Sequence, residues 1–231
     1  MGTTHQGVIS ISRQALQRMP VYLQYLKKLQ TQGAQTAASP AVAEALGLGE
    51  VQVRKDLAAV STIQGVPKKG FPIDKLIADI EHFLGYNSVR QAVLVGAGYL
   101  GRALLSYRGF EQYGLDIVTA FDNDEALVGC QICGKHILSS QQIPEMCQRM
   151  NVHIGIITAP ADQAQIVCDQ LVAGGILAIW NFAPVRLHAP QHILVQNENM
   201  AASLALLSQH LKSRINTDET KEGIDNEHTA F

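Results

Sequence analysis

The sequence predicts an α/β protein in which an N-terminal winged helix-turn-helix domain is followed by a Rossmann-like doubly wound parallel sheet and a C-terminal helix. Two observations carry this prediction. Short amphipathic helical segments surround a glycine turn in the first third, and a glycine-rich fingerprint later lies between an apolar strand and a helix. The 231 residues include 47% hydrophobic and 16% charged residues with a net charge of −2, which excludes a disordered chain and a strongly basic binder.

The charges are distributed unevenly along the chain. Residues 1–85 hold nine Lys/Arg against six Asp/Glu, residues 86–211 hold six against nine, and residues 212–231 hold three against five. A polyanionic partner is therefore expected to meet the first part of the chain.

Neither a secretion signal, a membrane span nor a metal site is expected. The first ten residues lack a basic start and an apolar run, and no stretch approaches about 18 apolar residues, so we predict a cytoplasmic protein. Cys130 and Cys133 form a lone C-x-x-C between glycines, which favours a hairpin over a redox or zinc site. Pro190 separates His188 from His192 and argues against a shared helix face for these two ligand-like residues.

The first predicted helix covers residues 12–32. Ser12 is its expected cap and Gly33 its stop, and Pro20 is expected to kink or divide it. Its apolar residues recur every three or four positions and are Leu16, Met19, Leu23, Leu26 and Leu29.

Two shorter helices follow around a tight turn. Ser39 is the expected N-cap of the second helix and Pro40 its first residue, and Gly47-Leu48-Gly49 separates it from a third helix over residues 50–60. In the third helix Val53, Leu57 and Val60 are expected to face inward, whereas Gln52, Arg54, Lys55 and Asp56 project elsewhere. Helix-turn-helix proteins show this pattern and lay the second helix of the pair in a DNA major groove.

The polar side chains of the third helix suit contact with DNA. Arginine presents a planar fork of donors to phosphate or guanine, glutamine can read adenine, and lysine supplies a point charge. Residues 64–71 have a basic tip between turn residues, as a wing that contacts the DNA backbone requires. A helical dimerisation domain with a solvated charged face is the alternative. The predicted DNA-binding residues are Ser39, Gln52, Arg54, Lys55, Lys68 and Lys69.

A domain boundary is predicted after residue 85. Residues 74–84 are predicted to form another amphipathic helix, and residues 85–88 a linker. We therefore expect a winged-helix DNA-binding domain over residues 1–85 and a Rossmann domain with a C-terminal dimerisation helix over residues 86–211. Residues 212–231 contain almost nothing apolar and are predicted to be a disordered tail.

The strongest motif is a glycine fingerprint in its required context. Residues 92–95 are an apolar run of strand length, Gly96-Ala97-Gly98-Tyr99-Leu100-Gly101 follows, and Asp122 ends the next predicted strand, 21 residues beyond Gly101. The glycines allow a tight turn, close approach to a pyrophosphate and close packing of helix on strand, and Asp122 is expected to accept bonds from the adenosine ribose. Because a carboxylate repels a 2′-phosphate, NAD(H) is favoured over NADP(H). A domain that has lost its nucleotide is the alternative.

Strands and helices alternate in the rest of the domain. Helices are predicted over residues 141–150 and 161–173, and strands over residues 153–158, 175–180 and 193–195. Ligands of such sheets bind outside the carboxyl ends of the strands, so residues 158–160 and 181–184 are candidate walls of a nicotinamide site or ordinary turns. Residues 199–211 carry one apolar stripe that completes the domain or packs on another subunit, formed by Met200, Leu204, Leu207 and Leu211.

A dinucleotide domain normally suggests a dehydrogenase. The chain has no Tyr-x-x-x-Lys, and about 125 residues for the nucleotide domain leave no second, substrate domain. A small NAD-dependent oxidoreductase with an N-terminal dimerisation domain is therefore the alternative to a nucleotide-responsive DNA-binding protein.

Several motifs stand in the order and spacing of one family. They are Ile11-Ser12-Arg13, Val53-Arg54-Lys55-Asp56-Leu57, Gly96 to Leu104, Ala120-Phe121-Asp122, Ala159-Pro160-Ala161 with Ala164-Gln165, and Asn181-Phe182-Ala183-Pro184-Val185. From about residue 11 to residue 211 the chain resembles the Rex-type redox-sensing transcriptional repressors.

The resemblance implies a non-enzymatic homodimer that binds double-stranded operator DNA when NADH is scarce and leaves it when NADH binds. It also implies a last helix that is swapped onto the partner subunit. Arg54 and Lys55 would lie on the recognition helix and Lys68 and Lys69 on the wing, with Tyr107 near the nicotinamide. The predicted NAD(H)-binding residues are Gly96, Ala97, Gly98, Tyr99, Leu100, Gly101, Tyr107, Phe121, Asp122, Thr158, Ala159, Pro160, Asn181 and Phe182.

Three positions depart from the family pattern. The wing around residues 59–67 differs and is about one residue longer, which predicts an altered operator preference. Asn199 and Met200 stand where the family has an Asp and a bulky residue, and Met19 stands where the first helix usually offers an Arg to that Asp. This predicts that the redox state is sensed through another contact, or that another nucleotide is the effector.

Overall fold

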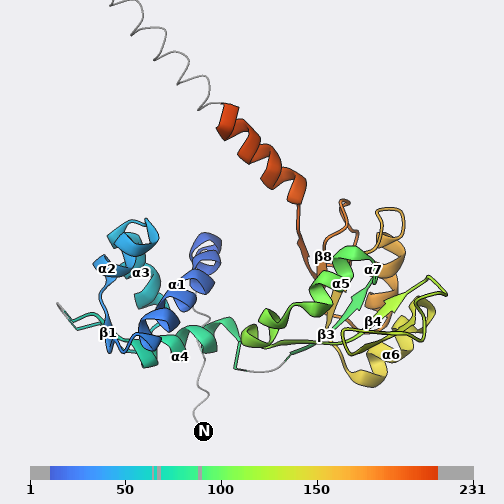
Figure 1. Cartoon of the computed structure of the whole chain (residues 1–231), viewed down its shortest axis with the longest axis horizontal. Coiled ribbons are helices and arrows are strands. Elements are labelled where there is room, and N and C mark those ends of the chain that lie inside the picture. The colour runs from blue at the N-terminus through green and yellow to red at the C-terminus, as the bar shows by residue number, and fades with distance from the viewer. Residues whose placement is uncertain (1–10, 64, 67–68, 88–89, 213–231) are drawn as a thin grey trace, which may run out of the picture. The chain divides into compact units, whose positions relative to one another are not determined.

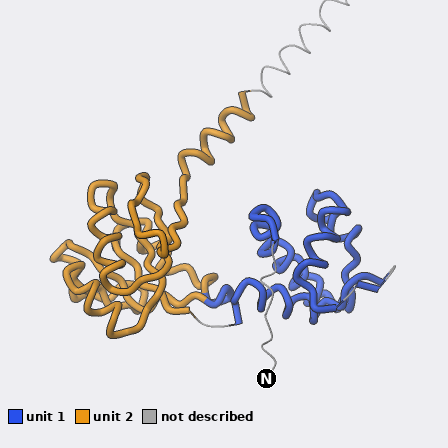
Figure 2. The backbone as a smooth tube through the Cα atoms, turned by 180° about the vertical axis from the view of Figure 1, so that it is seen from behind, with its two compact units in different colours: residues 1–89, 111–114 blue, residues 90–110, 115–231 orange. Residues whose placement is uncertain are grey.

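The computed structural model describes residues 11–63, 65–66, 69–87 and 90–212. The chain forms two compact units (Figure 2). The first unit comprises Met1–Val89 and Glu111–Gly114, and the second comprises Arg90–Phe110 and Leu115–Phe231. Each unit has its own hydrophobic core and is described by itself below.

The first unit is a small helical domain with a two-stranded sheet (Figure 1). The strands β1 and β2 are antiparallel, with Ala37 opposite Phe71. Its core contains Tyr22, Leu57 and Ile80, which no solvent reaches. The elements are α1 (Arg13–Thr31), β1 (Thr36–Ala37), α2 (Ser39–Leu46), α3 (Glu50–Val60), β2 (Phe71–Pro72) and α4 (Ile73–Leu84).

The helix termini confirm some of the expected signals and correct others. The Ser12 side chain caps α1 by accepting from the Ala15 N–H, and Gly47 ends α2 in the left-handed conformation. Pro20 was expected to kink the first helix or divide it; α1 runs through Pro20 as one helix, so division was wrong, and packing of its apolar face holds the helix together. Ser39 is the first helical residue rather than the cap, and Ala38 holds the cap position without a side-chain bond.

The second unit is built on a seven-stranded sheet with the order β5-β6-β4-β3-β7-β8-β9. All neighbouring strands are parallel except β5, which is antiparallel to β6. The strands are β3 (Arg90–Val95), β4 (Leu115–Asp122), β5 (Gln131–Ile132), β6 (Lys135–Ser139), β7 (Ile154–Ile157), β8 (Ala178–Asn181) and β9 (Leu194–Asn197). After β3 the chain adds β4 and β6 toward one edge of the sheet, then crosses back to add β7, β8 and β9 toward the other edge. The direction in which strands are added therefore reverses between β3 and β7. This is the topology predicted from the glycine fingerprint.

Helices cover both faces of the sheet. Val93 and Val95 of β3 pack with the helices on one face, and the alternating Ala92 and Leu94 pack with Leu105 of α5 on the other. The helical elements of this unit are α5 (Tyr99–Ser106), the 3₁₀ helices η1 (Arg108–Tyr113, whose end belongs to the first unit) and η2 (Ser140–Gln142), α6 (Ile143–Met150) and α7 (Ala164–Ala173). The strand expected over residues 175–180 begins only at Ala178, because Gly175 is left-handed and Ile176 still donates to Leu171 of α7.

The four cysteines lie in two different environments. Cys130 and Cys133 are exposed on the predicted hairpin, where Cys133 and Gly134 both have positive φ in the turn between β5 and β6. Cys147 and Cys168 are buried, and burial raises the pKa of Cys147 to about 11 and also raises that of Cys168. The buried thiols therefore stay protonated and serve as core residues.

Residues 200–212 form the last described helix. The Asn199 side chain caps it by accepting from the Ala202 N–H at 2.9 Å. Every residue from 200 to 212 is exposed, including Met200, Leu204, Leu206, Leu207 and Leu211. The predicted apolar stripe therefore exists and has no cover within the described chain. The expected tail covers residues 212–231; residue 212 still belongs to this helix, and residues 213–231 lie outside the described residues.

Two kinds of feature are absent from the described residues. No helix there has the length and apolarity to cross a membrane. No group of three or more His, Cys, Asp or Glu side chains in this part of the chain could hold a metal ion.

Candidate functional site

The turn after β3 requires glycine at two positions. Gly96 has φ +104°, and a Cβ there would lie 2.8 Å from the Ala159 backbone nitrogen and the Thr158 carbonyl carbon. A Cβ on Gly101 would collide with the Gly96 carbonyl oxygen, so glycine lets α5 pack against the turn. Gly98 occupies the N-cap position of α5, and no side chain bonds the first N–H groups of the helix from there. A Cβ at Gly98 would meet open space. The first N–H groups of α5 are therefore available to an anion.

Asp122 fixes this turn from the end of β4. One carboxylate oxygen accepts from the Ala97 N–H at 2.6 Å, and the other accepts from the Asp124 N–H at 2.9 Å. The side chain is buried to 9% exposure and lines a cavity. Asp122 thus shapes the loop and still has acceptor capacity for a ligand.

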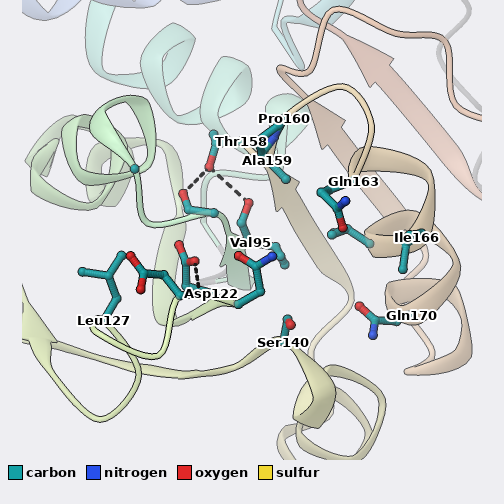
Figure 3. A pocket seen from close by; sticks show the side chains of 15 residues that line it. Val95, Asp122, Leu127, Ser140, Thr158, Ala159, Pro160, Gln163, Ile166 and Gln170 are labelled. Carbon is teal, nitrogen blue, oxygen red and sulfur yellow. Dashed lines mark hydrogen bonds between the residues drawn. The ribbon is translucent and has the colours of Figure 1, made fainter.

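Thr158 joins the ends of β3 and β7. Its hydroxyl contacts the Gly96 carbonyl oxygen at 2.7 Å and the Val95 carbonyl oxygen at 3.2 Å, and its N–H donates to Val95 (Figure 3). These bonds hold the two strand ends together where the strand order reverses, which is where ligands of this fold class bind.

A cavity of about 500 Å³ opens at these strand ends (Figure 3). The predicted residues that line it are Gly96, Gly98, Asp122, Thr158, Ala159 and Pro160. The remaining walls are Val95, Asn123, Asp124, Leu127, Ser140, Gln163, Ile166, Val167 and Gln170. Gln163, Ile166 and Gln170 lie at helical spacing on one face in or beside α7, and this spacing directly after the Ala159-Pro160 turn was the available sequence signal.

The other predicted cofactor residues are not among those that line the cavity. Phe121 is buried beneath the turn, and Tyr99 is 98% exposed on α5. Asn181 is fully buried and its amide is used: it donates to Val185 and Asn197 and accepts from the Ala183 N–H. The residues outside the walls are Ala97, Tyr99, Leu100, Gly101, Tyr107, Phe121, Asn181 and Phe182. Ala97 and Gly101 belong to the turn, and Tyr107 and Phe182 contact other aromatic rings.

A second concave surface lies in the first unit between α2, α3 and the wing. This groove has a volume of about 760 Å³ and includes Ser39 at the start of α2, Arg54 on α3, and Val66 and Gly70 on the wing. Val66 and Gly70 exchange two backbone hydrogen bonds of 2.8 Å. Arg54 and Lys55 are exposed on α3, and Lys69 is exposed between the paired wing residues. Lys68 lies outside the described residues.

The sequence pattern predicts that Asp56 projects from α3 away from the core, but the structure buries it. It is 7% exposed and accepts from Arg18 at 2.7–2.8 Å and from the Tyr22 hydroxyl at 2.8 Å. Burial, together with the bond to Asp56, raises the pKa of Tyr22 to about 12, so Tyr22 remains a neutral donor. Turned so that its amide oxygen faces Arg18, Gln52 accepts from the Arg18 Nη1 at 2.8 Å. Arg18 of α1 therefore bonds two residues of α3, Asp56 and Gln52, and the Gln52 amide oxygen already accepts from the Arg18 guanidinium.

Asp79 of α4 anchors the start of the wing. It accepts from the Thr62 N–H at 2.7 Å and from the Lys75 ammonium at 3.0 Å, and the Thr62 hydroxyl lies within 3.0 Å. Burial alone raises the pKa of this carboxyl, but the Thr62 N–H and the Lys75 ammonium outweigh burial and hold the pKa below its ordinary value.

Asp79→Asn is expected to lower the free energy of unfolding by about 1–2 kcal/mol at neutral pH. Because the folded-state pKa lies below the unfolded value of about 3.9, the contribution of Asp79 is full above about pH 4 and is lost as the pH falls through the lowered pKa. Urea unfolding followed by circular dichroism at about pH 6 and pH 3 measures this loss. The variant should lose less stability on acidification than the wild type, whereas Glu44→Gln, at an exposed position on α2 of the same unit, should behave as the wild type.

Met19 is fully buried in the core of the first unit. A side chain at this position packs beside Tyr22 and Leu23 and cannot offer a surface contact to a C-terminal helix. The expectation that Met19 replaces one end of a charged switch was therefore wrong, because the residue lies on the core face of α1.

Two family models match the chain. Residues 10–58 match the family described as "Putative DNA-binding protein N-terminus", and residues 87–185 match the family described as "CoA binding domain".

Relatives and solved structures match almost the whole chain. The redox-sensing transcriptional repressor Rex of Bacteroides fragilis is 38% identical over 207 residues, which span 90% of this chain and 94% of the relative. RSP, a Rex-family repressor, has been solved with β-NAD+ and operator DNA; that structure matches with a TM-score of 0.84 at 29% identity and covers 92% of this chain and 97% of RSP. RSP with β-NADH matches with a TM-score of 0.80 at 29% identity, over 90% of this chain and 98% of RSP.

Proposed function

Because the chain belongs to the Rex family of redox-sensing transcriptional repressors, we propose that it binds operator DNA through the α3 groove when NADH is scarce and is released when NADH enters the cavity. One observation carries this proposal. A single chain has a glycine turn closed by Asp122 in one unit and, in the other, a groove between a recognition helix and a wing. RSP, which matches over both units, has been solved with the corresponding two ligands.

The chemistry of the cavity favours NAD(H). The N-terminus of α5 suits the pyrophosphate, and Asp122 suits the adenosine ribose. Of the described residues that line the cavity, two are carboxylates, Asp122 and Asp124, and none is a lysine or arginine. A nucleotide with an extra phosphate on its ribose, such as NADP(H) or coenzyme A, would meet negative charge without a counter-ion there. Thr158, Ala159 and Pro160 would form the wall toward the nicotinamide.

A second copy of the chain is the proposed cover for the helix of residues 200–212. Its large apolar side chains are exposed in one chain, and a palindromic operator needs two recognition helices about 34 Å apart or a multiple of that distance. The family makes the chain a regulator rather than an enzyme, so the oxidoreductase alternative is set aside. A regulator of operator DNA works in the cytoplasm, which is the location we propose.

A gel-shift assay with genomic fragments tests the function. We expect the purified protein to retard a subset of fragments without nucleotide or with NAD+, and NADH to abolish the shift. At the same concentration NADPH should leave the complex intact, because its 2′-phosphate faces Asp122. A ligand with a hundredfold preference for the unbound form shifts the equilibrium by about 2.7 kcal/mol. A chain that retards no fragment at low salt, or that NADH never releases, contradicts the proposal.

Lys69→Ala is expected to weaken operator binding about equally for all operator sequences, because a wing lysine contacts phosphate rather than bases. Each lost phosphate contact lowers the slope of log K against log[salt] by about 0.9, so a dimer should lose about 2. Fluorescence anisotropy over a salt series measures the slope. An unchanged slope would mean that the wing does not contact the backbone.

A further inference from the structure

Trp180 is the single tryptophan of the sequence and lies at a junction in the second unit. It belongs to β8 and is partly buried, and its indole N–H donates to the Glu198 carboxylate at 2.8 Å. A hydrogen bond to a charged acceptor is stronger than one between neutral groups. The bond joins β8 to the residue that lies two positions before the C-terminal helix begins.

This bond completes the anchor of that helix. β9 pairs with β8 up to Asn197, whose side-chain oxygen accepts from the Asn181 amide at 2.8 Å. The Glu198 N–H then donates to the Asn181 carbonyl at 2.8 Å, and Asn199 caps the helix. Because every residue of the helix from 200 to 212 is exposed, the bonds from Trp180 and Asn181 fix where the helix starts.

The Trp180 ring also belongs to a row of aromatic contacts. Tyr107, directly after α5, meets Phe110 edge-on at 4.9 Å between ring centroids, and Phe110 meets Trp180 edge-on at 5.8 Å. Trp180 then contacts Phe182 at 4.8 Å. The row therefore connects the end of α5, whose N-terminus faces the nucleotide cavity, with β8 and the anchor of the helix.

We propose that Trp180 is a positioning residue that couples the nucleotide site to the start of the C-terminal helix through its hydrogen bond to Glu198. The inference rests on the proposed function, because the coupling is measured through the release of DNA that NADH causes. Nucleotide beside α5 shifts the aromatic row, and the indole transmits this shift to Glu198. The helix that Glu198 precedes is the segment offered to the second subunit, so its start sets the arrangement of the dimer.

Three variants separate the hydrogen bond from ring packing. Trp180→Phe keeps an aromatic ring but removes the N–H, Glu198→Ala removes the acceptor, and Glu198→Gln keeps an acceptor oxygen. Glu145→Ala, which removes an exposed carboxylate from α6, is the matched control. The measured quantity is the NADH dissociation constant of the DNA-bound protein divided by that of the free protein, with a genomic fragment retarded by the wild type as DNA.

We expect Trp180→Phe and Glu198→Ala each to reduce this ratio about tenfold, equivalent to about 1.4 kcal/mol of coupling. NADH affinity of the free protein and the thermal midpoint should change little. The double variant should lose no more than either single one, because both remove the same bond. Glu198→Gln should retain most of the ratio, and Glu145→Ala all of it. An unchanged ratio in Trp180→Phe, additive losses in the double variant, or a loss accounted for by lower NADH affinity alone overturns the inference.

Emission from Trp180 gives a readout that does not depend on DNA. NADH binding to the wild type should change the wavelength or intensity of this emission, beyond any energy transfer to the reduced nicotinamide, and NAD+ should change it differently. A chain that binds NADH with no such change refutes the role of Trp180 even if the repressor works. A chain that shows the change but ignores every genomic fragment refutes the proposed function instead.

Discussion

Replacing Gly96 with alanine is expected to lower NADH affinity at least about a hundredfold, equivalent to about 2.7 kcal/mol. The residue has φ +104°, which costs an alanine about 1–3 kcal/mol of backbone strain. The added Cβ also meets the Ala159 nitrogen and the Thr158 carbonyl carbon at 2.8 Å, so the ends of β3 and β7 must separate. Separation displaces the N–H groups that would cradle the pyrophosphate. Titration calorimetry with NADH measures the loss.

Gly98→Ala is the control for the Gly96 variant. Its Cβ would enter open space at ordinary φ, so the thermal midpoint should stay at the wild-type value, whereas that of Gly96→Ala should fall by several degrees. NADH affinity of Gly98→Ala should fall only if the pyrophosphate occupies that space. Wild-type NADH affinity in Gly96→Ala would show that this turn does not hold the nucleotide.

Arg54→Ala is expected to weaken operator binding a hundredfold or more while NADH affinity stays unchanged. Arg54 is exposed on α3 and lines the groove that runs to the wing. An arginine fork on guanine contributes about 1–3 kcal/mol, and a dimer loses two such contacts. Anisotropy titration of a retarded fragment measures the DNA affinity, and calorimetry measures that for NADH.

Arg149→Ala removes the same charge from an exposed site on α6 and serves as the matched control. It should bind the operator within about twofold of the wild type, since a charge outside the interface acts only through the screened field. Equal weakening by both variants would reduce the role of Arg54 to net charge. Loss of NADH binding in Arg54→Ala would indicate misfolding.

The fold was predictable because its signals are local. The glycine turn follows from steric limits on a few adjacent residues, and the sheet follows from apolar runs of strand length separated by helices. Helix ends are harder to predict from the sequence than the helices themselves. Ser39 and Ala38 are adjacent candidates for the N-cap of α2, and the backbone conformation places Ala38 there. Pro20 shows that packing of a helix face can outweigh the loss of one hydrogen bond.

The candidate sites were only partly predictable because partners far apart in sequence decide which polar residues are buried. Asp56 looks solvent-facing in the helical pattern, yet Arg18 and Tyr22 from another helix bury it. Asn181 looks like a ligand contact, yet its amide bonds β9 and its own loop. Gln163, Ile166 and Gln170 have helical spacing directly after the Ala159-Pro160 turn, but this spacing does not show that their face turns toward the strand ends, because that depends on how α7 packs beside the sheet.

The uncovered leucines of residues 200–212 link regulation to copy number. Full burial of a leucine side chain is worth about 1.5–3 kcal/mol, and a lone molecule leaves this unrealised until it meets another. Mass action then makes operator occupancy fall on dilution, even at a fixed ratio of reduced to oxidised nucleotide. A cell that holds few copies would keep its promoters open whatever its metabolic state, so synthesis of the repressor sets the threshold on which the nucleotide acts.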